Sequence, residues 1–125
     1  MTNILLWIDD ERHMPEGYTH WAKTSQEAID ILSKLSAEDV LVVVSFDHDL
    51  GYNYDDGHSF LDGGVSDDNT RRVATWMVER HVFPEVAIIH SHNPIGASWL
   101  YRTLVYDGPE GMKVIKAPFD AKLYE

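Results

Sequence analysis

Acidic side chains follow two of the most apolar runs of this sequence, at the point where each run ends. Asp9 and Asp10 come directly after residues 4–8, and Asp47 comes directly after residues 41–46. Carboxylates crowded at one place repel one another, and a bound hard cation relieves that repulsion. One Asp after a strand is usually a turn or cap residue, but two such clusters favour a metal site. The three aspartates are therefore predicted metal ligands.

Histidines stand close to the same positions. His48 directly follows the second acidic position, and His90 and His92 flank Ser91 after the apolar run 86–89. Imidazole suits Zn²⁺, Mn²⁺ or Fe²⁺ better than Mg²⁺, and it also exchanges protons near neutral pH. Each histidine alone has an ordinary reading as a hydrogen-bonded polar residue. Together they predict at least one functional role, with His48 and His90 as the candidates for proton transfer.

Other polar residues are candidates for placing a ligand. Asn93 precedes a proline, which keeps it extended or in a turn, so it either orients a ligand through its amide or simply forms the turn. Lys116 ends an apolar run and can pair with a phosphoryl oxygen or with Asp47. Arg71 and Arg72 open a predicted helix; a solvated helix end is the favoured reading, and a phosphate anchor is the alternative.

Strand-like and helix-like segments alternate along the chain. The predicted strands are residues 4–8, 18–23, 41–46, 86–89 and 112–116, and the predicted helices begin near residues 24, 70 and 97. Thr24 and Glu27 have the spacing of a capping box at the first of these helices. This alternation predicts one three-layer α/β/α domain over residues 1–125, with a five-stranded, mostly parallel sheet and helices on both faces.

The predicted sheet explains why the polar clusters matter together. Ligands of parallel α/β sheets bind outside the carboxyl ends of the strands, where the acidic and histidine clusters of this chain would converge. The region 52–69 is rich in Gly and Asp and is predicted to be a loop insertion that contributes specificity.

Composition narrows the function further. The chain has 125 residues, no cysteine and a formal net charge of -11. The acidic balance argues against nonspecific binding to duplex nucleic acid, because that binding needs Lys and Arg to neutralise phosphates. Without cysteine there is no disulfide framework and no thiolate zinc site. No apolar run is long enough for a signal peptide or a membrane span, so we expect a cytoplasmic protein without membrane partners.

The order of these residues resembles that of response-regulator receiver domains. The resemblance implies the strand order 2-1-3-4-5, Mg²⁺ bound by the acidic pair and Asp47, and a metal contact from the backbone of Asp49. It also implies that Asp47 accepts a phosphoryl group, with Ser91 and Lys116 beside it. Two features depart from receivers: residues 10–17 are too short and turn-rich for a first helix, and Ala117 separates Lys116 from the following proline.

A divergent receiver-like group is the better match. Trp-Ile-Asp-Asp-Glu-Arg at residues 7–12, Asp-His-Asp-Leu-Gly at 47–51 and His-Ser-His-Asn-Pro at 90–94 resemble motifs of the cyclic-phosphate processing receiver domains. This resemblance implies a role on cyclic or terminal phosphates of nucleotides or RNA, with a phosphorylated small molecule or nucleotide as the partner. Mg²⁺ is the expected cofactor, with Mn²⁺ or Zn²⁺ as alternatives.

Three functions follow from these observations. The first is metal-dependent hydrolysis of a phosphate ester, with His48, His90 and Asp47 in the chemistry and Ser91, Asn93 and Lys116 placing the phosphate. The second is a phosphoacceptor signalling module that uses Asp47. The third is a module that binds a nucleotide or a protein without chemistry, and for it the acidic surface is the relevant feature.

Overall fold

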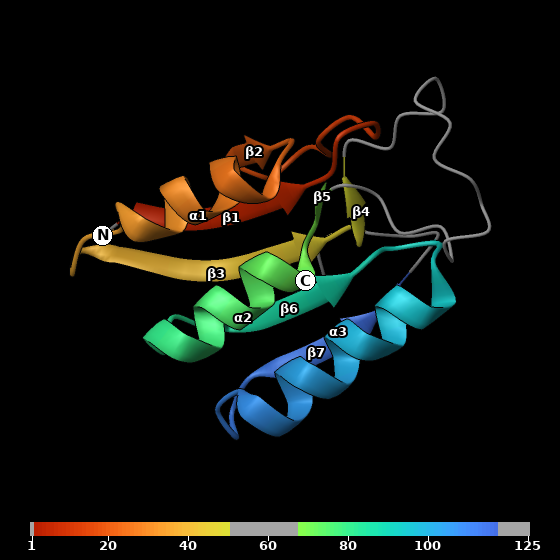
Figure 1. Ribbon diagram of the computed structural model, residues 1–125. Helices are drawn as coiled ribbons and strands as arrows, with labels where there is room; N and C mark the ends of the chain where they lie inside the picture. The colour runs from red at the N-terminus through yellow and green to blue at the C-terminus, as the bar shows by residue number, and fades with distance from the viewer. Residues whose placement is uncertain (1, 51–67, 118–125) are drawn as a thin grey trace.

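The structure, a computed structural model, describes residues 2–50 and 68–117 (Figure 1). In chain order its elements are β1 (Thr2–Ile8), β2 (His20–Ala22), α1 (Ser25–Ser33), β3 (Asp39–Phe46), β4 (Asp49–Leu50), β5 (Asp68–Asn69), α2 (Arg71–Arg80), β6 (Val86–Ile89), α3 (Pro94–Asp107) and β7 (Lys113–Lys116). The five predicted strands and three predicted helices are all present, with ends shifted by a few residues.

Five strands form a parallel sheet in the order β2-β1-β3-β6-β7. When only these strands are numbered along the chain, this is the order 2-1-3-4-5, so the predicted receiver-like α/β fold class is confirmed. Parallel neighbours need a crossover connection, and α1, α2 and α3 supply it for β2 to β3, β3 to β6 and β6 to β7. Residues 9–19 connect β1 to β2 without a helix, as predicted.

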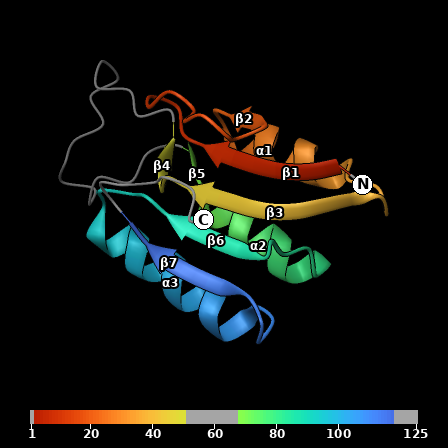
Figure 2. The same cartoon turned by 180° about the vertical axis from the view of Figure 1, so that it is seen from behind.

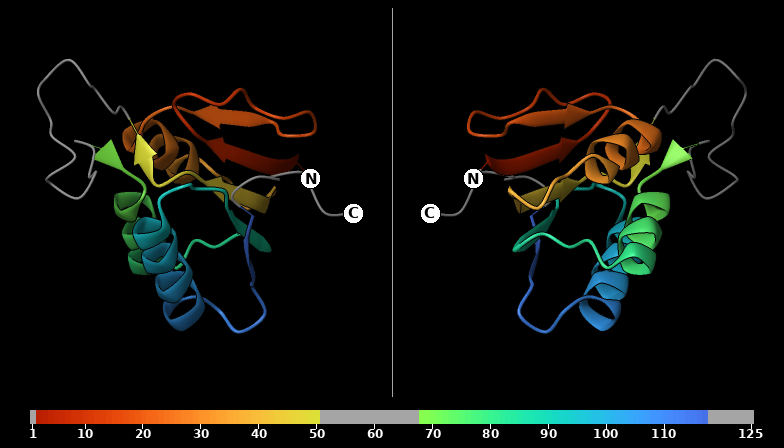
Figure 3. Two further views of the ribbon diagram at one scale, coloured as in Figure 1. Left: turned by 90° about the vertical axis from the view of Figure 1, so that its right-hand side faces the viewer. Right: turned by 90° about the vertical axis from the view of Figure 1, so that its left-hand side faces the viewer.

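The three helices cover the same face of the sheet, and α2 contacts both α1 and α3 (Figures 1 and 3). Figure 2 shows the other face, with the strands in front of the helices. The part of the chain that the structure describes therefore has two layers, whereas three were predicted. Crossovers are right-handed, and those through α1, α2 and α3 all run in the same direction across the sheet. Only the connection from β1 to β2 runs the opposite way, and it lacks a helix.

Side-chain alternation divides the core between the two faces. Ile8, Phe46 and Ile89 belong to the large cluster beneath the helices. Trp7 and Ile88 belong to a smaller cluster on the opposite face. Because successive residues of a strand point to opposite faces, the residue that follows each last strand residue is directed away from the helices.

Local signals explain where the first helix begins. Thr24 Oγ1 accepts a hydrogen bond from the Glu27 N–H at 3.0 Å, and Glu27 Oε2 accepts one from the Thr24 N–H at 3.1 Å. This is the predicted capping box, and it satisfies two N–H groups that the helix leaves unpaired. A cap of this kind contributes about 1 kcal/mol to stability.

The end of the predicted 52–69 loop differs from expectation. Residues 68–69 form β5, which pairs antiparallel with β4. Thr70 then precedes α2, so this helix begins at Arg71. Asp49 pairs with Asn69 and Leu50 with Asp68, which composition alone did not reveal. The rest of the predicted loop lies outside the described residues.

Among residues 2–50 and 68–117, no helix combines the length and the hydropathy that a membrane span requires.

Candidate active site

The residues that follow the central strands stand side by side at the carboxyl edge of the sheet. The N–H groups of Asp9, Asp47 and His90 extend the ladder by donating to backbone oxygens of the neighbouring strand at 3.0, 2.9 and 2.9 Å. Register between strands therefore fixes the relative positions of the three side chains. The convergence predicted from the sequence is found for these residues.

The carboxylate of Asp9 is fully buried and accepts four donors. Its Oδ1 accepts the N–H groups of Glu11 and Arg12 at 2.8 and 2.9 Å. Its Oδ2 lies 3.0 Å from Nε2 of His90 and 3.2 Å from Nε of Arg12. Burial by itself raises the pKa of Asp9, but the hydrogen bonds from His90, Arg12 and Glu11 together hold that pKa below its ordinary value. Asp9 is therefore a fixed anion.

His90 is fixed by three neighbours. Its Nδ1 lies 2.7 Å from Oγ of Ser45, and its ring stacks on Trp7 with centroids 3.9 Å apart and planes 2° from parallel. Burial lowers the pKa of His90 more than its hydrogen bond to Asp9 raises it, so the ring is neutral. Because a carboxylate only accepts, Nε2 carries the proton and donates to Asp9, while Nδ1 accepts from the Ser45 hydroxyl. Both ring nitrogens are thus engaged.

Arg12 supplies the cation at this edge. Its Nε contacts Oδ2 of Asp9, its NH2 nitrogen lies 3.8 Å from Oδ1 of Asp47, and its NH1 nitrogen donates to the His90 carbonyl at 2.9 Å. The guanidinium group therefore bridges two carboxylates that would otherwise repel each other. Arg12 was not among the site residues predicted from the sequence, which were mainly carboxylates and histidines. The signal was its place three residues after Asp9 within the first motif.

Asp47 differs electrostatically from Asp9. Its side chain is 14% exposed and accepts the N–H of His48 at 2.9 Å. Burial, and secondarily the negative charge of Asp9, raise the pKa of Asp47 from 3.8 to about 7, although Arg12 opposes this. Two neighbouring carboxylates with pKa values shifted in opposite directions are typical of a functional site.

His48 is fully buried and belongs to a separate network on the helix face. Its Nε2 accepts a hydrogen bond from Nε of Arg71 at 2.9 Å, and its Nδ1 lies 2.7 Å from Oδ1 of Asp49. Since Nε of arginine only donates, the proton of His48 is on Nδ1 and is donated to Asp49. Asn93 donates to the other oxygen of Asp49 at 3.2 Å. His48 therefore links α2 to the start of α3.

The first turn of α3 is shaped to fit this network. Asn93 is its N-cap, and Oδ1 of Asn93 accepts the Gly96 N–H at 3.0 Å. A Cβ atom on Gly96 would lie within 2.6 Å of Nδ1 of His48, far inside van der Waals contact. The absent side chain of Gly96 thus makes room for the His48 ring. Asn93 serves both as helix cap and as a partner of Asp49.

The family model for the cyclic-phosphate processing receiver domain matches residues 4–106 of the 125. The chain belongs to this family. Comparison with curated proteins and with solved structures gives no match. The resemblance inferred from the three motifs is therefore confirmed, and the match includes both histidine networks and the acidic edge.

The acidic edge of this receiver domain has the donors that a divalent cation needs. Asp9, Asp10 and Asp47 each offer a carboxylate oxygen, and these atoms lie within 4.8 Å of one another. A set of ligands made only of carboxylate oxygens is of the type that Mg²⁺ and Mn²⁺ prefer. Arg12 competes for the same negative charge, since it contacts two of the three carboxylates. The carboxylate of Asp49 faces His48 and Asn93, and the metal contact expected from its backbone carbonyl stays a prediction.

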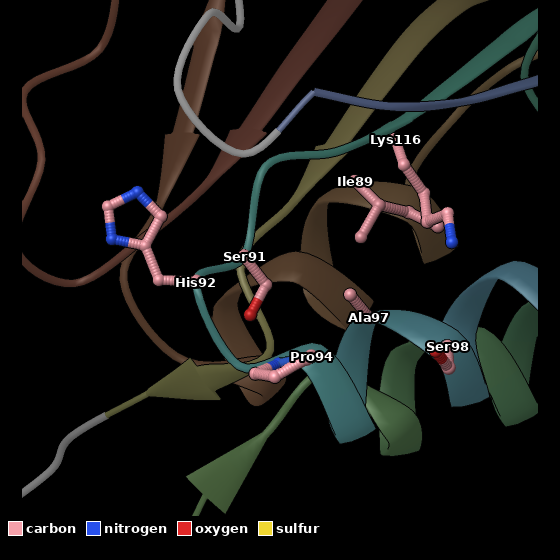
Figure 4. Close-up of a pocket in the computed structure, with 7 residues that line it drawn as sticks. All are labelled: Ile89, Ser91, His92, Pro94, Ala97, Ser98 and Lys116. Carbon is pink, nitrogen blue, oxygen red and sulfur yellow. The ribbon is translucent and has the colours of Figure 1, made fainter.

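Ser91 and Lys116 line a cavity of about 340 Å³ between β6, β7 and the start of α3. Figure 4 shows them among mostly apolar neighbours, with the ring of His92 directed away from the other lining side chains. The Lys116 ammonium group lies 5.1 Å from the ring centroid of Tyr101. Within residues 2–50 and 68–117, no ion pair joins Lys116 to Asp47.

The predicted site residues thus fall into three neighbouring groups. Asp9, Asp10, Asp47 and His90 meet at the acidic edge; His48, Asp49 and Asn93 form the buried network; Ser91 and Lys116 line the cavity. Arg12 and Ser45 complete these groups without having been predicted, and Arg71 was considered only as an alternative phosphate anchor. Their roles depend on contacts across the sheet, which sequence spacing does not reveal.

Proposed function

We propose that this receiver domain hydrolyses a cyclic or terminal phosphate on a nucleotide or RNA end, with a divalent cation held by Asp9, Asp10 and Asp47. The observation that carries the proposal is the clustering of these carboxylates beside Arg12 at the carboxyl edge of the sheet. Membership of a cyclic-phosphate processing family supports the choice of substrate. Mg²⁺ is the first choice of cation, with Mn²⁺ and Zn²⁺ as alternatives.

Arg12 is the residue best suited to contact the phosphate. Its side chain is 37% exposed, and hydrogen bonds to Asp9 and to the His90 carbonyl fix its orientation. Guanidinium groups bind phosphate oxygens through paired N–H donors. When bound, a divalent cation would add Lewis-acid polarisation of a phosphate oxygen. Asp47 lies next to Arg12 and is partly exposed, so its carboxylate is accessible to such a ligand.

The two histidines are better suited to positioning than to moving protons. Each is fully buried, and each has one ring nitrogen donating to a carboxylate and the other accepting from a donor. A proton carrier needs a nitrogen within reach of the substrate. We therefore assign His90 to the orientation of Asp9, and His48 to the orientation of Asp49. The earlier expectation that they transfer protons stays a prediction.

A substrate panel tests the proposal. The purified protein is incubated with Mg²⁺, Mn²⁺ or Zn²⁺ and with 2′,3′-cyclic nucleotides, 3′,5′-cyclic nucleotides and cyclic oligonucleotides, at enzyme concentrations near those of the substrate. We expect release of a phosphomonoester that Asp47→Asn and Arg12→Gln abolish or strongly reduce. The exposed Asp30→Asn variant on α1 serves as the matched control. Absence of turnover with every pair of metal and substrate would overturn the proposal.

One observation favours the phosphoacceptor alternative. Asp47 directly follows the central strand, β3, of a receiver-type sheet and remains partly exposed. The position of Lys116 over Tyr101 speaks against it, because the receiver resemblance expects that lysine beside the acceptor. Acetyl phosphate with Mg²⁺ would add one labile phosphoryl group, detected by mass, and Asp47→Asn would prevent the addition.

A further inference from the structure

Arg71 makes two side-chain contacts, one through Nε and one through the face of its guanidinium group. Its Nε donates to Nε2 of His48 at 2.9 Å, and its guanidinium carbon lies 5.0 Å from the ring centroid of Trp99. Within the part of the chain that the structure describes, no hydrogen bond or ion pair engages its two terminal amino groups. The guanidinium is thus fixed in orientation and keeps the paired donors that bind phosphate oxygens.

Arg71 is half-buried and carries one of the few positive charges of this acidic chain. Asp and Glu number 21 against 10 Lys and Arg, so carboxylate partners are abundant. Arg12 contacts Asp9 and Asp47, yet the Nε of Arg71 meets a neutral imidazole instead of a carboxylate. The adjacent Arg72 differs as well, since its amino groups reach Ser25 and Gln26 on α1. Among the described residues this half-buried cation contacts no carboxylate, and it is therefore suited to an anionic ligand.

Arg71 and the acidic edge lie close together but on different faces of the sheet. His48, the partner of Arg71, packs against Gly96 on the helix face. Asp9 is bound to His90, which stacks on Trp7 of the opposite face. The two groups are neighbours because His48 directly follows Asp47, and Oγ1 of Thr70, the residue before Arg71, donates to the carbonyl of Asp47 at 2.6 Å. One phosphate cannot occupy both positions.

We propose that Arg71 binds a second phosphate of the substrate, distinct from the phosphate that reacts at Asp9, Asp10 and Asp47. The inference rests on the proposed function for the identity of the reacting phosphate. It defines the substrate class: a molecule with at least two phosphates, such as an oligonucleotide end or a cyclic dinucleotide, is preferred over a cyclic mononucleotide. Trp99 holds the guanidinium plane, and His48 fixes its direction.

The kinetic test compares two substrates. One is adenosine 2′,3′-cyclic monophosphate, and the other is a 5′-phosphorylated dinucleotide that ends in a 2′,3′-cyclic phosphate. Arg71→Gln should lower kcat/KM for the dinucleotide by about tenfold to a hundredfold more than for the mononucleotide, as expected for loss of a charge-assisted hydrogen bond. Arg71→Lys should restore part of the preference. Arg72→Gln, next in sequence, should leave it unchanged.

A binding test does not depend on turnover or on any variant. The side-chain Nε–H signal of Arg71 is followed by NMR in the wild-type protein during titration with adenosine 3′,5′-bisphosphate and with adenosine 5′-monophosphate. We expect the bisphosphate to shift this signal and to bind more tightly than the monophosphate. If the bisphosphate shifts the Arg71 signal but no substrate is turned over, the inference is supported while the proposed function fails. Turnover with a preference that Arg71→Gln does not alter, or an unmoved Arg71 signal at saturation, overturns the inference alone.

Discussion

Replacing Asp47 with Asn should stabilise the protein at neutral and alkaline pH. The pKa of Asp47 is raised from 3.8 to about 7, so the folded state opposes its ionisation. At about 1.4 kcal/mol for each pKa unit, full ionisation costs the folded state up to about 4 kcal/mol. Partial exposure and the coupling to Asp9 reduce this, and we expect about 2 to 4 kcal/mol. Asn keeps the oxygen that accepts the His48 N–H and removes the charge.

The sign of the pH dependence follows from the direction of the shift. Because the folded-state pKa of Asp47 lies above the unfolded value, its contribution is fully present below about pH 4 and is lost as the pH rises through about 7. The stability advantage of Asp47→Asn over wild type should therefore grow by about 2 kcal/mol between about pH 5 and pH 8. Chemical unfolding in EDTA at several pH values measures it, with Asp30→Asn as the control.

Two results would refute this reasoning. A stability difference that does not change with pH would mean that Asp47 titrates normally. A variant less stable than wild type at about pH 8 would mean that the pairing of Asp47 with Arg12 outweighs burial of the charge. Adding Mg²⁺ extends the test, since a cation held by ionised Asp47 should stabilise wild type more than Asp47→Asn.

Two further substitutions test the networks around the site. Gly96→Ala should destabilise the protein by about 1 to 3 kcal/mol, because the new methyl group would overlap the buried His48 ring. Gly111→Ala is the control and should be neutral, because there is open space around Gly111. Equal melting temperatures of the two variants would contradict the predicted clash at Gly96. Arg12→Gln should cost about 1 to 3 kcal/mol in metal-free buffer, since it leaves two carboxylates without their cation. The same variant should bind Mg²⁺ more tightly by calorimetry, and weaker binding would show that Arg12 supports the metal site instead of competing with it.

The sequence predicted the elements that are decided locally. Residues 4–8 and 41–46 are apolar enough to form central strands, and the polar residues that follow them necessarily meet at one edge. Thr24 and Glu27 marked a helix start because capping depends on neighbours three residues apart. Residues 2–50 and 68–117 lack the predicted third layer, although the short, turn-rich connection at residues 10–17 was recognised.

Contacts between residues far apart in the sequence could not be predicted from such local patterns. Arg71 meets His48 only because β4 and β5 pair and bring residue 68 beside residue 50. Arg12 reaches the His90 carbonyl across a sequence separation of 78 residues. Residue type predicted that such groups do chemistry, but partner choice depends on which side of the sheet each side chain faces. His48 and His90 illustrate this, since both were assigned to one site and lie on different faces.

The two histidines have the same hydrogen-bonding arrangement in opposite chemical settings. Each ring donates to an aspartate and accepts from a donor, Ser45 for His90 and Arg71 for His48. For His90 the acceptor Asp9 also accepts two backbone N–H groups and the donor Ser45 is neutral, so this network holds an anion in place. For His48 the donor is itself a cation with unused amino groups, so this network holds a positive charge in place. A fixed anion that organises Arg12 and a fixed cation nearby together favour a substrate whose negative charges are spread over more than one phosphate.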